Sequence, residues 1–95
     1  MEMLLMRDDI QFTLQPSSDA QSYGRGDTVR LTTANLRHEY QLDVSILFRE
    51  GNVFHGSVIA AAPRLDIPLK AWEINPGEEV VFRKENIAKA LPGAR

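Results

Sequence analysis

Apolar and polar residues alternate in three short stretches of this chain, and a period of two predicts β-strands. The apolar members are Ile10, Phe12 and Leu14 in the first stretch, Val29 and Leu31 in the second, and Val80 and Phe82 in the third. Pro16 ends the first predicted strand, and the polar, glycine-bearing residues 17–26 predict a surface loop. Residues 33–39 break the alternation, so we expect them to cross between strands.

The clearest pattern lies at the centre of the chain and predicts a β-hairpin over residues 40–60. Its apolar face is expected to consist of Tyr40, Leu42, Val44, Ile46 and Phe48 in the first strand, and of Phe54, Val58 and Ala60 in the second. Because directly opposed residues share a face, this pattern also restricts the register of the two strands.

This hairpin could close through either of two turn lengths. A two-residue turn at Glu50-Gly51 would oppose Ile46 to His55, which would place a histidine on the apolar face. A three-residue loop over residues 49–51 instead opposes Ile46 to Phe54, and it places Gly51 at the left-handed position that a G1 bulge requires. We therefore predict the three-residue loop, in which Leu42 also pairs with Val58, and Tyr40 with Ala60.

Gly56 interrupts the second strand, and a glycine at mid-strand marks a bend or a close approach of another element. We expect it to lie opposite Val44 and to let the hairpin coil, with Trp72 packed over the gap. Residues 84–91 can form at most two helical turns before Pro92-Gly93. The predicted fold is mainly β: a small, partly open antiparallel barrel of five to six strands with a short C-terminal helical turn.

The composition of the chain indicates its class of protein but says little about its chemistry. At 95 residues, with 43% hydrophobic residues and no cysteine, the chain is expected to form one domain, residues 1–95, around an ordinary packed core. The net charge of −2, with both signs interspersed, is typical of a solvated surface. No apolar run approaches the roughly 18 residues of a membrane span, and the start is too short and too acidic for a secretory signal. We therefore expect a cytoplasmic protein.

Short curved strands around a glycine-bent hairpin look like a small SH3-like barrel. The stretch from Ile67-Pro68-Leu69-Lys70 to Glu85-Asn86-Ile87, which contains Pro76-Gly77-Glu78-Glu79-Val80-Val81-Phe82, resembles the closing part of SH3-like β-barrel domains of uncharacterised bacterial proteins. Gly51-Asn52-Val53-Phe54-His55-Gly56-Ser57-Val58 is similar to their central hairpin. This resemblance covers the second half of the chain, and it implies a fold without any activity or functional residue.

Four polar residues with the side chains of a nucleophilic triad are expected on the outer face of the hairpin. In the predicted register Ser45 opposes His55 and Asp43 opposes Ser57, which brings these groups within about 4.5–8 Å of one another. A triad also requires an oxyanion hole and a pocket that excludes water, and alternation alone places polar residues on a wet face. We therefore assign no catalytic residue, and no residue spacing indicates a metal or another cofactor.

Six residues are candidates for binding without catalysis: Tyr23, Arg25, Arg37, His38, His55 and Trp72. Tyr23, Arg25, Arg37 and His38, together with Arg30 and Tyr40, are also the side chains from which a nucleic-acid-binding barrel would build its basic, aromatic groove. The 13 acidic residues against 11 basic ones argue against that use. A lone tryptophan either belongs to the core or anchors a partner.

The leading functional hypothesis is a non-enzymatic binding or interaction module that acts through a barrel groove or an oligomer interface. The apolar start, Met3-Leu4-Leu5-Met6, would add an edge strand or meet a second copy in a homodimer. A protein partner or a small ligand is also compatible with the residues. The alternatives are a nucleic-acid-binding barrel, and an enzyme whose site forms only between subunits.

Overall fold

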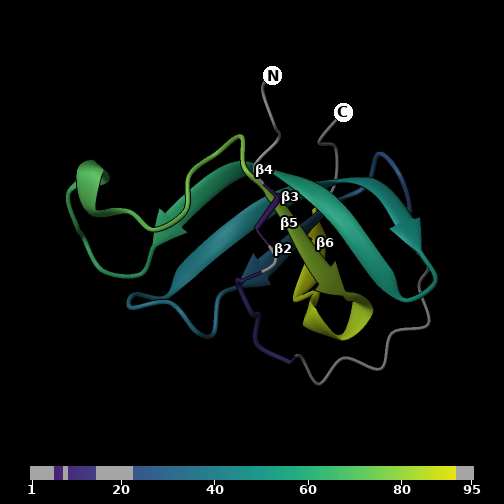
Figure 1. Ribbon diagram of the computed structural model, residues 1–95, viewed down its shortest axis with the longest axis horizontal. Helices are drawn as coiled ribbons and strands as arrows, with labels where there is room; N and C mark the ends of the chain where they lie inside the picture. Colours follow the sequence, from purple (N-terminus) through teal and green to yellow (C-terminus); the bar gives the residue numbers. More distant parts are fainter. Residues whose placement is uncertain (1–5, 8, 15–22, 92–95) are drawn as a thin grey trace.

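The computed structural model describes residues 6–7, 9–14 and 23–91, which form one sheet in the order β1-β5-β4-β3-β2-β6 (Figure 1). The strands are β1 Met6–Arg7, β2 Thr28–Thr32, β3 Tyr40–Glu50, β4 Val53–Pro63, β5 Glu79–Arg83 and β6 Lys89–Leu91. Short 3-10 turns are η1 Leu69–Ala71 and η2 Lys84–Asn86. All pairings are antiparallel except that of β1 with β5. The prediction of a mainly β domain is confirmed, and the sheet, with β1 and β6 at its two ends, is not closed.

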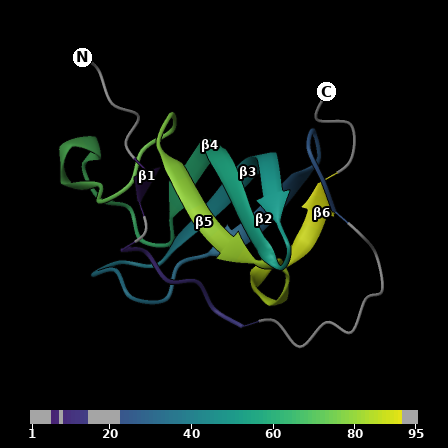
Figure 2. The same ribbon diagram turned by 45° about the vertical axis from the view of Figure 1, so that its right-hand side comes forward.

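Strands β3 and β4 form the predicted hairpin, which curves across the whole molecule (Figures 1 and 2). Glu50 pairs with Val53, so the turn consists of Gly51 and Asn52 alone, and the predicted three-residue loop is wrong. Gly51 has a φ of 61° while Asn52 has a negative φ. Glycine with positive φ at the first of two turn residues is typical of a type II′ turn, whose twist matches that of antiparallel strands.

The predicted register of the hairpin is also wrong, because the turn lies at Gly51-Asn52 and two β-bulges then shift the pairing along the strands. Ile46 pairs with Gly56 instead of Phe54, and the next pair joins Phe48 to His55, so that Leu47 is the inserted residue. A second shift inserts Ile59. The observed partners of Tyr40, Leu42 and Val44 are Pro63, Ala61 and Val58, where Ala60, Val58 and Gly56 were expected. Each inserted residue changes the phase of the alternation, so the two predicted core residues Phe48 and Ala60 are exposed.

The predicted strands around Val29 and Val80 are confirmed as β2 and β5, whereas both ends of the described chain differ from expectation. The first predicted strand is reduced to a single bridge between Phe12 and Thr33, and Leu14 is 75% exposed. Residues 84–91 form only the turn η2 and then the strand β6, because pairing with β2 satisfies the backbone there. Of the apolar start, Met6 lies in β1 beside β5, and residues 3–5 lie outside the described residues.

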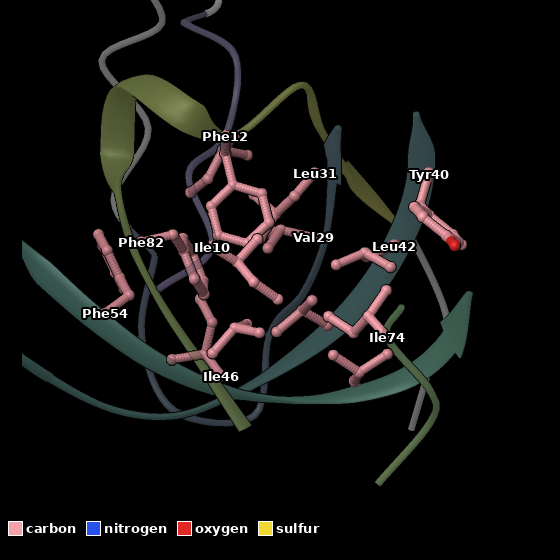
Figure 3. Close-up of a cluster of buried hydrophobic side chains, with 14 of the residues drawn as sticks. Ile10, Phe12, Val29, Leu31, Tyr40, Leu42, Ile46, Phe54, Ile74 and Phe82 are labelled. Atoms are coloured by element: carbon pink, nitrogen blue, oxygen red, sulfur yellow. The ribbon is translucent and has the colours of Figure 1, made fainter. Parts of the chain in front are cut away.

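The core lies on the inner face of the curved sheet (Figure 3). Its buried members are Ile10, Phe12, Tyr23, Val29, Leu31, Tyr40, Leu42, Val44, Ile46, Phe54, Val58, Ile74, Val80, Phe82 and Ile87. The expected close approach at Gly56 is present: a Cβ atom there would meet Val44, the carbonyl oxygen of Ser45 and Phe82. Trp72 is not one of these nearest neighbours; it packs edge-on against Tyr40, with ring centroids 6.3 Å apart.

Candidate interaction surface

The four residues that suggested a triad do not form one. Ser45 pairs with Ser57, not with His55, and Asp43 pairs with Ala60. The carboxylate of Asp43 instead accepts a hydrogen bond of 2.9 Å from Nε of Arg30, and this bond raises the pKa of the arginine. An imidazole that faces neither a hydroxyl nor that carboxylate across the strands cannot act as the base of a triad. The two-residue turn at Gly51-Asn52 is the physical reason, because it makes Phe48 the partner of His55, and the bulge at Leu47 follows only beyond that pair.

The same bulge creates an apolar surface on the outer face of the hairpin. Leu47 and Phe48 are consecutive residues, and they are 37% and 45% exposed. The ring of Phe48 stacks on the imidazole of His55 with a centroid distance of 4.3 Å and an interplanar angle of 12°. We call Leu47, Phe48 and His55 the hairpin patch. Sequence reasoning assigned Phe48 to the core; the signal it missed is the run of three apolar residues that begins at Ile46, which breaks the alternation.

His55 is held in place by the stack with Phe48 on one face of its ring and by Glu50 at its edge. Its side chain is largely buried, and Nε2 lies 3.7 Å from Oε1 of Glu50. Nδ1 is buried and finds no hydrogen-bond partner in the described part of the chain. On the neighbouring strand His55 pairs with Val81. The imidazole therefore offers the hairpin patch a flat ring beside Phe48, with one acidic neighbour at its edge.

Two other predicted binding residues, Tyr23 and Arg25, lie near this end of the hairpin. Tyr23 is buried in the core, and its carbonyl oxygen accepts a hydrogen bond of 3.0 Å from Nη1 of Arg49. Arg25 is exposed in the turn before β2, and the next residue donates its backbone N–H to the carbonyl of Ile46 at 2.9 Å. Arg25 therefore belongs to a turn beside the hairpin patch, whereas the ring of Tyr23 is inside the molecule.

The remaining three predicted binding residues, Arg37, His38 and Trp72, come together at the opposite end of the hairpin through Glu73. The carboxylate of Glu73 accepts the backbone N–H groups of Arg37 and His38, both at 3.0 Å. Its own backbone N–H donates to the hydroxyl of Tyr40 at 2.8 Å. Burial alone would raise the pKa of Glu73, but the two backbone hydrogen bonds and the nearby positive charges hold it below its usual value.

This cluster around Glu73 is a structural clamp between two loops. Trp72 packs on Tyr40 and donates its indole N–H to the carbonyl of Ile67 at 3.3 Å, so it is half-buried against the core. Sequence reasoning missed Glu73, because nothing in the local pattern relates it to residues more than thirty positions away. The hydrogen bonds of the cluster are internal to the fold, so the hairpin patch is the stronger candidate for binding.

Residues 6–7, 9–14 and 23–91 contain no group of three or more histidine, cysteine, aspartate or glutamate side chains that could hold a metal ion. No helix in that part of the chain is long and apolar enough to span a bilayer.

No protein-family model matches the chain, and no curated protein or solved structure is significantly similar to it.

Proposed function

We propose that this protein is a non-enzymatic interaction module that associates with a second copy of itself through the hairpin patch. The observation that carries the proposal is the bulge that places Leu47 and Phe48 together in solvent. A regular ladder would have alternated these two side chains between the core and the surface. Aromatic side chains are enriched at protein interfaces, and burial of apolar area is the main favourable term in most associations.

The charges beside the hairpin patch favour a second copy as the partner. Glu50 lies at the edge of His55, and the exposed Arg25 lies in the turn beside Ile46, so one acidic and one basic group border the patch. In an isologous dimer each contact occurs twice, and Glu50 of one copy is then complementary to Arg25 of the other. Nucleic acid requires an excess of positive charge, which this balanced border does not provide.

The same proposal includes the fold: we propose that the chain forms a barrel of the SH3-like kind. Strands β2, β3, β4 and β5 are consecutive neighbours, and the chain then returns through the single turn η2 to place β6 beside β2. This strand order supports a small barrel of the SH3-like kind, and the glycine that bends β4 supports it further. Such a barrel would display the hairpin patch on its outer surface.

Sedimentation velocity over a range of concentrations tests the proposal. The wild-type protein is expected to dimerise, and Phe48→Ser to weaken the dimer at least about thirtyfold, because the loss of one aromatic anchor costs about 2 kcal/mol and both copies lose theirs. Leu69→Ser is the matched control, since Leu69 is 68% exposed but lies in η1, outside the patch. The proposal is contradicted if the wild-type protein stays monomeric, or if Phe48→Ser dimerises with the same dissociation constant as the wild type.

A charge exchange tests the identity of the partner. Glu50→Arg should weaken the dimer, and the double variant that also carries Arg25→Glu should restore it, because the two opposite charges are then merely exchanged. If the double variant is weaker than either single variant, the two residues do not face each other in the dimer.

A further inference from the structure

A hollow of about 290 Å³ lies between the N-terminal segment of the chain and the end of β5. Its lining residues are Ile10, Gln11, Phe12, Val53, Val81, Phe82, Arg83 and Asn86. The volume is at the lower end of the range for small-molecule sites, which fits a group of about one ring. The hollow is distinct from the stacked pair of the hairpin patch, although Val53 and Val81 are strand neighbours of that patch.

The floor of the hollow is apolar and fixed by the core. Phe12 packs edge-on against Phe82, with centroids 6.4 Å apart, and Phe82 stacks on Phe54 at 5.5 Å (Figure 3). The side-chain amide of Asn86 donates hydrogen bonds of 3.3 Å to the carbonyls of Phe12 and Thr13. These contacts join both walls of the hollow, so the site is already formed before any ligand enters.

The rim of the hollow carries one positive charge. Of the lining residues that the structure describes, Arg83 alone is charged, and its side chain is exposed. Its guanidinium takes part in no ion pair with any described residue. An arginine beside an apolar hollow is suited to a carboxylate, which it can bind with two parallel hydrogen bonds.

The edge of β5 leaves room for a ligand at this point. β1 pairs with Glu79 and Val80 only, so residues 81–83 have no strand partner on that side among the described residues, and of their backbone groups the N–H of Arg83 already donates to Oδ1 of Asn86 at 2.9 Å. Unpaired backbone along a strand edge can hydrogen-bond an extended ligand. An apolar floor, an arginine that forms no ion pair with any described residue, and a strand edge without a described strand partner therefore occur together at one place.

We propose that this hollow binds an apolar ring or branched side chain that carries a carboxylate. The source of this chemistry is either a small organic acid or the carboxyl terminus of a peptide that ends in an apolar residue. The site goes beyond the proposed self-association and does not depend on it. Arg83 binds the carboxylate, and Phe12 and Phe82 contact the apolar group.

Amide proton–nitrogen NMR titration with phenylacetate, and with uncharged phenylacetamide, tests the site. Phenylacetate is expected to bind with a dissociation constant of about 1 mM, as suits so small a ligand, and to shift the amide signals of Gln11, Val81 and Arg83. A short peptide ending in free phenylalanine, compared with the same peptide as its amide, separates the two sources. If the peptide with the free carboxyl terminus binds more tightly than phenylacetate, the source is a peptide carboxyl terminus. If phenylacetate binds more tightly, the source is a small organic acid. Equal binding of acid and amide would contradict the role of Arg83, and shifts scattered over the surface would overturn the site.

Variants complete the test. Arg83→Gln should weaken phenylacetate binding about tenfold, and Arg83→Lys should weaken it less, because the charge remains while the paired donors are lost. Lys70→Gln is the matched control, since Lys70 is an exposed cation in η1 outside the lining. Repeating the titration in Phe48→Ser separates the two proposals: phenylacetate should still bind when self-association is lost. Unchanged affinity in Arg83→Gln, with a well-dispersed spectrum, would refute the assignment.

Discussion

An alanine at position 56 would place a methyl group in space that neighbouring atoms already occupy. Its Cβ would overlap Cγ1 of Val44, lie 3.0 Å from the carbonyl oxygen of Ser45 and lie 3.3 Å from Cε1 of Phe82. None of these atoms can move away easily. Val44 is fully buried and has a stiff, branched side chain, the Ser45 oxygen belongs to the backbone, and Phe82 is stacked in the core.

The expected loss of stability is the difference between two terms. Overpacking by one methyl group in a close-packed interior costs about 1–3 kcal/mol. Alanine also reduces the conformational freedom of the unfolded chain relative to glycine, which stabilises by about 0.5–1 kcal/mol. Gly56 does not have a positive φ, so backbone strain adds nothing. The net destabilisation of Gly56→Ala is therefore about 0–2.5 kcal/mol, which is about 1–3 kcal/mol relative to a glycine-to-alanine change without overpacking, against a total stability of about 5–14 kcal/mol for a chain of this length.

Urea denaturation followed by the fluorescence of Trp72 measures this difference. Gly24→Ala is the control, because a Cβ at Gly24 meets nothing within 4 Å and its φ is not positive. We expect the control to match the wild type or to be about 0.5 kcal/mol more stable. If Gly56→Ala is as stable as Gly24→Ala, with an unchanged denaturant slope, the strands do not pack closely at the bend and the reasoning is refuted.

Two further predictions concern single residues outside the core. Although burial opposes it, the hydrogen bonds to Glu73 lower its pKa below the usual 4.5, so its stabilisation is present above that pH and is lost as the pH falls through the folded-state pKa. The melting temperature of Glu73→Gln should therefore fall less on acidification than that of the wild type; parallel pH profiles would contradict this. Gly51→Ala should lose about 1–2 kcal/mol in urea denaturation, because a φ of 61° is costly for any residue with a Cβ. An unchanged midpoint would mean that the turn has another conformation.

Alternation located the central hairpin correctly and misplaced its register, because the turn lies at Gly51-Asn52 and because the residues of the bulge do not reveal an insertion. Leu47 and Phe48 are both apolar, so either could be the core residue that follows Ile46. The local pattern does not distinguish a regular ladder from one with an inserted residue, because an insertion only changes the phase. The run of apolar residues after Val58 hides the second insertion, Ile59, in the same way.

Long-range contacts were beyond the reach of sequence patterns. Glu73 reaches the loop that contains Arg37, and Ile74 is buried in the core although it belongs to none of the predicted strands. The strands β2 and β5 were predictable because each follows a glycine turn and carries its own alternating apolar residues. The hollow beside Arg83 was not, since its walls come from residues near both ends of the chain.

Core packing explains why Phe48 is outside the molecule. Phe54, Phe82 and Phe12 pack on one another in the core, and Gly56, which pairs with Ile46, leaves space that Val44 and Phe82 fill. If Phe48 turned inward while it still paired with His55, the adjacent Phe54 would turn outward, because paired residues share a face and successive residues of a strand point to opposite faces. If exclusion from the core were the whole explanation, Phe48→Ser would leave both stability and sedimentation unchanged. A loss of the dimer with little loss of stability would show instead that the excluded ring serves as a contact.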